Sequence, residues 1–290
     1  MSGALLVEAT GPLTLLLDLG RPGLAHLGVS PSGAADRTAY RLANRLVGND
    51  QGAATLEVTL GGLAVRATTT AFAAVTGAPT TLRVDGLPTA SHTTLVLRPG
   101  SRLVVEPPPR GLRNHLAVRG GFVVPPVLGS RSRDVLAGIG PAPLAVGDLL
   151  PVGTPTAPLP DADRAPAPAP TTPAALVVRP GPRLDWFTED AWSTLLGTVW
   201  TVSADVDRVA VRLSGPALTR AVTDELPSEG LVRGAVQVPA SGQPLLFGPD
   251  HPVTGGYPVL AVLTAAAADI AAQLRPGDPV SLVSAPSTDR

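Results

Sequence analysis

The densest group of reactive side chains in this chain runs from Asp250 to Pro258 and reads Asp-His-Pro-Val-Thr-Gly-Gly-Tyr-Pro. The two adjacent glycines lack Cβ atoms, which lets backbone N–H groups approach an anion or an oxyanion. A plain turn between strands, the alternative interpretation, needs no Asp, His or Thr. We therefore favour a functional loop in which Asp250 and His251 would carry protons. Its candidate substrate-binding residues are Thr254, Gly255, Gly256 and Tyr257.

A second polar loop begins at Asp18, directly after an apolar run that predicts a strand. Asp18 could orient Arg21 or His26, and Arg21 could hold a carboxylate through two N–H groups. The loop leads into a helix that we expect to begin at Ser32 and to stop at Gly48. We take Asp18 and Arg21 as candidate catalytic residues, although a braced structural loop explains them equally well. His26 and Ser32 are candidate substrate-binding residues, and for Ser32 helix capping is the better explanation.

Two shorter glycine-containing segments add further candidates. Glu229, followed by Gly230, is a candidate base, and Gln237 could recognise an amide through its own amide group. Each of the two could equally be a satisfied turn residue. The candidate substrate-binding residues of the other segment are Arg119, Gly120 and Gly121.

The composition excludes several kinds of chemistry. All 22 basic residues are arginine, so the chain cannot carry biotin on a lysine, form a Schiff base or build a Walker A loop. It contains no cysteine, which rules out a thiol nucleophile, a disulfide and a zinc–thiolate site. We therefore expect no metal site and assign acid–base work to Ser, Thr, His, Asp, Glu or Tyr. A net charge of −1 argues against nucleic acid as the main partner.

The chain shows no targeting or membrane-spanning pattern. Its first ten residues have no basic region and too short an apolar run for a signal peptide. No apolar stretch approaches the roughly 20 residues that a membrane helix needs. The expected location is the cytoplasm, with no membrane partner.

The organisation of the chain predicts a mainly β protein in two parts. A segment rich in Pro and Ala, residues 154–173, reads as an extended, semi-rigid linker. It separates a β-rich N-terminal subdomain, residues 1–153, from a C-terminal β-barrel subdomain, residues 174–290. Short Val, Leu and Thr runs on both sides, broken by Gly and Pro, favour antiparallel barrels over a parallel sheet. Besides the helix at Ser32, short helices are expected from Thr188 to Gly197 and from Thr264 to Leu274.

Seven segments in this order resemble the biotin-dependent carboxyltransferase family, which includes the C subunit of 5-oxoprolinase, KipA, allophanate hydrolase subunit 2 and a domain of urea carboxylase. The resemblance covers about residues 7–283. It departs from the family pattern at Leu17, Arg133, Val253 and Ala210, each of which changes a potential polar contact. The matching segments are Asp18–Gly23, Pro31–Ala34, Asn44–Asn49, Arg119–Phe122, Leu128–Ser132, Ser228–Gly230 and Thr254–Pro258.

The resemblance implies two cyclophilin-like antiparallel β-barrel subdomains with a few short helices. It also implies an obligate partner, the 5-oxoprolinase B subunit, which is KipI-like or allophanate hydrolase subunit 1. A third subunit, the 5-oxoprolinase A subunit, would supply part of the machinery. The implied activity is ATP-dependent hydrolysis of 5-oxo-L-proline to L-glutamate, with ATP as co-substrate of the complex. On this view the arginines and the Gly255 and Gly256 amides would stabilise developing negative charge.

Two alternatives to the hydrolase remain open. One is the carboxyltransferase component of a urea carboxylase or allophanate hydrolase system, which would require biotin on another protein. The other is a non-catalytic, KipA-like protein that antagonises a kinase inhibitor, in which case the polar loops would form a partner surface.

Overall fold

The computed structural model describes residues 3–169 and 171–286, which form two compact units. The first unit contains residues 3–21, 32–134 and 138–169; the second contains residues 22–31, 135–137 and 171–286. Two short segments of the N-terminal half therefore belong to the second unit, which the expected subdomain ranges do not include. The prediction of a mainly β protein is confirmed.

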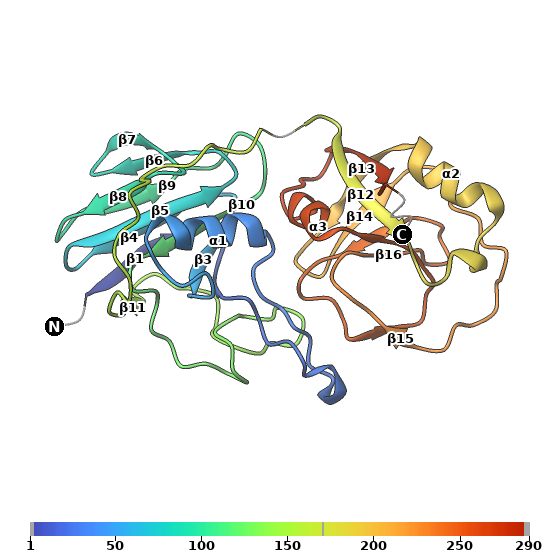
Figure 1. Ribbon diagram of the computed structural model, residues 1–290, viewed down its shortest axis with the longest axis horizontal. Coiled ribbons are helices and arrows are strands. Elements are labelled where there is room, and N and C mark those ends of the chain that lie inside the picture. Colours follow the sequence, from blue (N-terminus) through green and yellow to red (C-terminus); the bar gives the residue numbers. More distant parts are fainter. Residues whose placement is uncertain (1–2, 170, 287–290) are drawn as a thin grey trace. The chain divides into compact units, whose positions relative to one another are not determined.

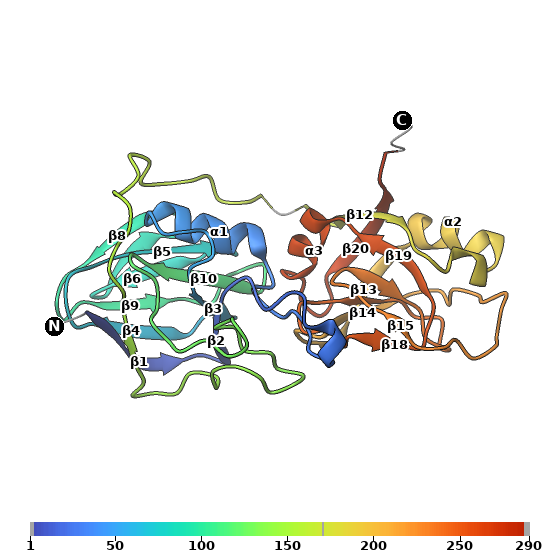
Figure 2. The ribbon, with the colours of Figure 1, turned by 60° about the horizontal axis from the view of Figure 1, so that its bottom comes forward.

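The first unit consists of two sheets and one α-helix (Figures 1 and 2). One sheet has the strand order β11-β1-β4-β9-β6-β7 and the other β2-β3-β10-β5-β8. Leu and Val side chains from both sheets form one buried apolar cluster between them. The strands are β1 (Ala4–Thr10), β2 (Leu13–Leu17), β3 (Thr55–Thr59), β4 (Leu63–Ala67), β5 (Ala71–Gly77), β6 (Thr81–Val84), β7 (Leu87–Ala90), β8 (Thr94–Leu97), β9 (Arg102–Val105), β10 (Arg113–Val118) and β11 (Leu149–Pro151).

The helix α1 (Arg37–Leu46) lies over β5 and β10, on the outer face of the second sheet (Figure 2). It begins later than expected, and the prediction that Ser32 caps it is wrong. Asp36 is the N-cap, and its carboxylate accepts the Ala39 N–H at 2.9 Å. Ser32 and Gly33 have φ angles of 53° and 98°, which no right-handed helix contains.

The second unit is a closed barrel in the order β12-β19-β16-β17-β14-β13-β20. Its first and last strands pair in parallel, so the expected antiparallel barrel has one parallel seam. Two further strands form a separate ribbon outside the barrel. The strands are β12 (Ala174–Pro180), β13 (Val199–Val206), β14 (Ala210–Ser214), β15 (Glu229–Gly230), β16 (Ala235–Gln237), β17 (Leu245–Phe247), β18 (Thr254–Gly255), β19 (Val259–Leu263) and β20 (Pro279–Ser284).

Short helices complete the second unit. The helix α2 (Glu189–Gly197) follows Thr188 as expected. The helix α3 (Ala265–Ala271) has the expected cap, Thr264, but ends before the predicted Leu274. Two 3-10 turns, η1 (Ala25–Leu27) and η2 (Leu184–Trp186), lie in loops. No helix among the described residues is long and apolar enough to cross a membrane.

Residues 154–169 form an extended strap that is fixed to the first unit (Figure 1). Arg164 makes a β-bridge to Thr93. The Thr94 N–H donates to the Asp163 carbonyl at 2.7 Å, and the Ala165 N–H donates to the His92 carbonyl at 2.9 Å. The strap is therefore extended, as the Pro-rich composition predicts, and its backbone bonds tie it to the turn before β8.

Candidate functional site

One edge of the second sheet gathers several of the predicted site residues. Strands β2 and β10 both run antiparallel to β3, and Leu17 and Leu116 pair with Thr55 and Leu56 at the start of β3. The chain therefore leaves β2 at Asp18 and leaves β10 at Arg119 along the same edge. The sheet topology thus places two of the sequence motifs at one end of the first unit.

Asp18 is the centre of a buried hydrogen-bond cage. Its carboxylate accepts the Ser130 and Ser132 hydroxyls at 2.5 and 2.6 Å. It also accepts the backbone N–H groups of Arg131 at 2.6 Å and Gly20 at 2.8 Å. Four donors occupy most of the acceptor positions of an ionised carboxylate. Asp18 therefore fixes the 130–132 turn and has few acceptor positions left for a hydrogen bond from a substrate.

Arg21 lies beside this cage and is only 2% exposed. Its Nη2 donates to the Ser132 carbonyl, and its Nε makes a long contact of 3.4 Å to the Val127 carbonyl. Its Nη1 is buried and has no hydrogen-bond partner among the described residues. A buried donor without a partner requires an explanation, and a bound electron-rich atom is one. Arg21 is therefore the predicted catalytic residue whose geometry best suits an oxyanion.

A tight turn covers the Arg21 side chain. Val127 and Ser130 exchange backbone hydrogen bonds of 2.8 and 3.2 Å. Between them Leu128 and Gly129 both have positive φ, 51° and 79°, which is unfavourable for leucine. The Leu128 side chain is 51% exposed. The turn that contacts Arg21 through the Val127 carbonyl thus has an exposed apolar tip.

Ser32 is tied to the same loops by its side chain. Its hydroxyl donates to the Arg133 carbonyl at 3.1 Å, and the nearby Ala34 N–H donates to the Asp18 carbonyl at 2.9 Å. A Cβ on Gly33 would lie 2.8 Å from the Leu19 backbone, so this position requires glycine. His26, in contrast, lies in a segment of the second unit, is exposed and contacts the Gly23 carbonyl through Nδ1 at 3.1 Å.

Arg119 and Gly120, at the same sheet edge, connect the sheet to neighbouring segments of the first unit. Arg119 donates from Nη1 to the Val47 carbonyl at 3.2 Å and from Nη2 to the carbonyl of Ala157 in the strap. Gly120 has φ of 94°, and a Cβ there would lie 2.1 Å from the Gly153 carbonyl oxygen. The predicted substrate-binding role of this motif, Gly121 included, stays a prediction, because the contacts seen connect the end of α1 to the strap.

In the second unit a two-stranded ribbon assembles several of the predicted residues. Glu229 pairs with Gly255, and Gly230 pairs with Thr254. Arg183 donates two hydrogen bonds to the Glu229 carboxylate, one of them from Nε at 3.1 Å. These bonds hold the pKa of the Glu229 carboxyl below its usual value. Glu229 is therefore a weaker base than an unpaired glutamate would be.

The same cluster contains Gln237, Gly255 and Tyr257. The Gln237 side-chain amide donates to the Tyr257 carbonyl at 2.8 Å. A Cβ on Gly255 would lie 2.9 Å from that amide nitrogen and 2.8 Å from the Leu231 side chain. Gly255 is therefore packed against two flexible side-chain ends, and neither Gly255 nor Gly256 has positive φ. The Tyr257 side chain, 47% exposed, is available for a ligand together with that of Thr254.

Asp250 and His251 come shortly before the ribbon strand β18, and both are buried. Asp250 is fully buried and accepts two hydrogen bonds from Arg208, at 2.8 and 3.2 Å, and one from the Val135 N–H at 3.0 Å. His251 is 2% exposed, and its Nδ1 lies 2.7 Å from the Pro252 carbonyl, so that nitrogen carries the proton. This geometry makes Asp250 an anchor for the 135–137 segment of the second unit.

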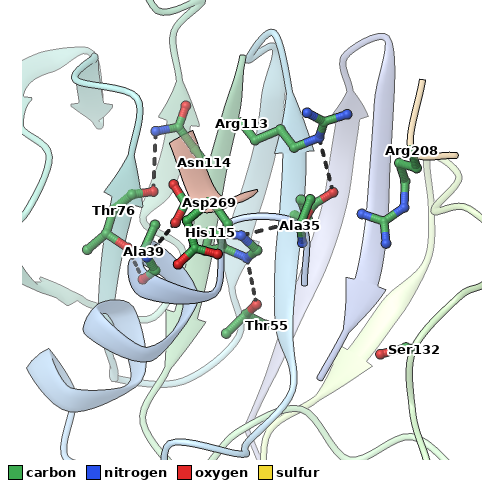
Figure 3. A network of polar contacts seen from close by, with 12 residues as sticks. Ala35, Ala39, Thr55, Thr76, Arg113, Asn114, His115, Ser132, Arg208 and Asp269 are labelled. Carbon is green, nitrogen blue, oxygen red and sulfur yellow. Dashed lines mark hydrogen bonds and ion pairs between the residues drawn. The ribbon is translucent and has the colours of Figure 1, made fainter. Parts of the chain in front are cut away.

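Sequence reasoning missed a buried polar network on the α1 side of the second sheet (Figure 3). The Glu57 carboxylate lies 3.5 Å from both Arg113 Nε and His115 Nε2, and His115 Nδ1 lies 3.1 Å from the Thr55 hydroxyl. The Glu57, Arg113 and His115 side chains are at most 4% exposed. The available signal was a glutamate at an alternating position of the apolar strand 55–59.

A family model decides what kind of domain this is. The model for the carboxyltransferase domain, subdomain A and B, matches residues 27–284. The chain belongs to the carboxyltransferase domain family. The resemblance seen in the sequence is thereby confirmed.

Curated relatives of this carboxyltransferase-domain chain fall into two groups. It is 37% identical over 276 residues to the 5-oxoprolinase C subunit of Escherichia coli, covering 94% of this chain and 88% of the relative. It is 33% identical to the 5-oxoprolinase C subunit of Haemophilus influenzae, covering 91% and 85%. It is 30% identical to the urea amidolyase of Lachancea kluyveri, covering 96% of this chain but only 17% of that protein.

Solved structures share the fold. The structure of TTHA0988 superposes with a TM-score of 0.89 at 34% identity, covering 97% of this chain and 56% of that one. The Kluyveromyces lactis urea amidolyase gives a TM-score of 0.87 at 30% identity, covering 97% of this chain and 18% of that one. This chain therefore spans little more than half of the first structure and under a fifth of the second.

Two of the departures from the family pattern lie at the Asp18 cage. Leu17 is fully buried and occupies the last position of β2, directly before the cage carboxylate. Arg133 follows the cage serine Ser132, and its Nη1 donates to the Gly138 carbonyl at 2.7 Å. With Leu17 and Arg133 at these positions, Asp18 accepts four hydrogen bonds.

Proposed function

We propose that this carboxyltransferase-domain chain is the C subunit of an ATP-dependent 5-oxoprolinase, which hydrolyses 5-oxo-L-proline to L-glutamate. The observation that carries the proposal is the 37% identity to the Escherichia coli 5-oxoprolinase relative over 94% of this chain and 88% of that protein. The match extends over nearly the whole of both chains, as expected if the two have equivalent places in the complex.

The geometry around Arg21 supports lactam chemistry. Hydrolysis of an amide builds negative charge on the carbonyl oxygen, and a preorganised donor in a water-excluded site stabilises that charge. Arg21 offers a buried, permanently charged donor, Nη1, that has no partner among the described residues. Asp18 fixes Ser132 by accepting a hydrogen bond from its hydroxyl, and Arg21 donates to the Ser132 carbonyl. The guanidinium is therefore already oriented before a substrate binds.

ATP would supply the free energy to activate the lactam carbonyl, which resists attack by water. Because the chain has no lysine, phosphate contacts made by this chain would depend on arginine and on backbone N–H groups. The ribbon cluster would bind substrate polar groups through the exposed Thr254 and Tyr257 side chains.

The proposed complex includes the 5-oxoprolinase B subunit, which is KipI-like, and the A subunit. Exposed apolar side chains beside the Asp18 cage are consistent with a partner surface in the first unit. Val123, Val127 and Leu128 are 53%, 41% and 51% exposed. Val127 and Leu128 belong to the turn that contacts Arg21, and Val123 comes four residues before it, so a bound partner would cover this turn.

The test is co-expression with the A and B subunits, followed by an assay of ATP-dependent glutamate release from 5-oxo-L-proline. Arg21→Lys keeps the charge but loses the planar fork, and we expect glutamate release to fall by roughly 100-fold or more. Arg98→Gln, at an exposed arginine in the turn before β9, is the matched control and should retain full activity. A wild-type complex that releases no glutamate would refute the assignment.

The second candidate is carboxyl transfer to a urea-type amide, with biotin carried by another protein. It is favoured by the similarity to urea amidolyases, at 30% identity and a TM-score of 0.87. Both activities require recognition of an amide, so one site could serve either. If the complex consumes carboxybiotin only when urea is present, this second candidate replaces the first.

A further inference from the structure

The buried Glu57 network lies directly beneath the strained turn of the candidate site. Glu57 is in the middle of β3, pairs with Leu15 of β2 and His115 of β10, and is 1% exposed. Because side chains alternate along a strand, Leu56 and Val58 face the apolar cluster between the sheets. Glu57 therefore points to the opposite face, on which α1 packs.

The Glu57 carboxylate reaches out of the sheet to a loop. Its Oε2 accepts the backbone N–H of Ala35 at 2.9 Å. Arg113 Nε lies 3.5 Å from Oε1 and His115 Nε2 lies 3.5 Å from Oε2. Both of these side chains are labelled in Figure 3. A buried carboxylate stays ionised only where charges and donors compensate for lost hydration. The arginine, the imidazole and the Ala35 N–H supply such compensation and hold the Glu57 acceptor at a fixed position under the turn.

The turn that Glu57 contacts is held in an unfavourable conformation. Ser32 has a φ of 53°, which is unfavourable for a residue with a side chain, and it is followed by Gly33, whose φ of 98° only glycine adopts readily. Such backbone persists only where surrounding contacts determine it, and it is frequent at functional sites. Three of the contacts that hold it join Ser32 to the Arg133 carbonyl, Ala34 to the Asp18 carbonyl, and Ala35 to Glu57. Glu57 supplies the only charged acceptor of these three.

We propose that Glu57 is a positioning residue that holds the 32–35 turn against the Asp18 loop and thereby fixes the site around Arg21. The expected effect of Glu57 on turnover rests on the 5-oxoprolinase function proposed above. It predicts that Glu57 acts through backbone geometry, without touching the substrate. Loss of its contact with Ala35 would loosen the turn while the sheet beneath it stays folded.

Glu57→Asp is the most direct test, because it keeps the charge near Arg113 but withdraws the carboxylate from Ala35 by one methylene. Amide hydrogen exchange in the intact chain should become at least 10-fold faster at Ala34 and Ala35, with exchange at Ala43 inside α1 unchanged. In the complete 5-oxoprolinase complex, kcat/KM for 5-oxo-L-proline should fall roughly 10- to 100-fold, as expected from small displacements of catalytic groups.

Thr76→Val is the matched control. Thr76 is on the same face of the sheet, is fully buried, and donates its hydroxyl to the Ala39 carbonyl of α1 at 2.6 Å. This variant removes a buried hydrogen bond of α1 without touching the turn. We expect wild-type exchange at Ala34 and Ala35 and wild-type turnover. Equal losses in Thr76→Val and Glu57→Asp would overturn the proposal, since both would then reflect general destabilisation.

The wild-type chain provides a test that does not depend on any variant folding. Ala35 lies outside every helix and strand, yet its N–H should exchange as slowly as amides inside β3. Fast exchange at Ala35 would overturn the positioning role. A wild-type complex without 5-oxoprolinase activity would refute the proposed function alone, because the exchange measurements do not depend on turnover.

Discussion

Replacement of Asp250 by Asn tests whether this residue anchors the fold or carries protons. Asp250 and Arg208 are 0% and 3% exposed, and two hydrogen bonds join them. Loss of the charge of one partner leaves the buried guanidinium without its carboxylate, which costs about 3–5 kcal/mol. For a unit of the size of the second one, this loss of free energy corresponds to a fall in its Tm of roughly 10–20 °C.

The assay is chemical denaturation of Asp250→Asn beside Asp205→Asn, a control at an exposed aspartate. The control should change the free energy of unfolding by at most about 0.5 kcal/mol. The double variant Arg208→Leu/Asp250→Leu should recover much of the loss, because a buried ion pair can be replaced by apolar side chains at little cost. A free energy of unfolding for Asp250→Asn within about 1 kcal/mol of the wild-type value, which is less than a tenfold change in the unfolding equilibrium, would refute the anchoring argument. A stable double variant without glutamate release would restore Asp250 to catalysis.

Three further predictions concern other parts of the chain. Burial lowers the pKa of His92 from its usual 6.5, so on acidification the unfolded chain takes up this proton before the folded chain does. The free energy of unfolding should therefore fall as the pH drops below about 6.5. The difference between the urea midpoints at pH 7 and pH 5 should be smaller in His92→Asn than in the wild type. Gly120→Ala would place a Cβ 2.1 Å from the Gly153 carbonyl oxygen at a φ of 94°, so we expect a loss of at least about 2 kcal/mol in the free energy of unfolding, measured by denaturation. Arg183→Gln removes the donor that lowers the pKa of Glu229, so carboxyl titration by NMR should show that pKa rising toward the usual value; an unchanged value would show that the pair does not form in solution.

Apolar strands were predicted best from the sequence. Six short apolar runs of the sequence, which lie near Gly or Pro residues and predict strands, coincide with β2, β4, β8, β9, β17 and β19. These runs are Leu13–Leu17, Leu63–Ala67, Thr94–Leu97, Arg102–Val105, Leu245–Phe247 and Val259–Leu263. Strand β3 was missed because Glu57 interrupts its apolar pattern. The helix cap was misplaced because Ser32 and Asp36 are both good capping residues, and only the backbone conformation distinguishes them.

The site was predicted as a set of residues and not as a set of contacts. Asp18 and the serines Ser130 and Ser132 are more than a hundred positions apart, so their hydrogen bonds depend on how two loops meet at a sheet edge. The buried partner of Asp250 is Arg208, and nothing in the spacing between them indicates an ion pair. Residue type alone therefore could not distinguish carboxylates that hold the fold together, such as Asp18 and Asp250, from carboxylates that are available for chemistry.

The parallel seam of the barrel has a consequence for biosynthesis. Strand β20 (Pro279–Ser284) lies between β12 and β13, so the barrel closes only when the last strand has left the ribosome. Until then β12 and β13 present unpaired edges to the crowded interior of the cell, where such edges promote aggregation. A premature stop before Pro279 should therefore yield an aggregating product, even though the great majority of the chain would be present.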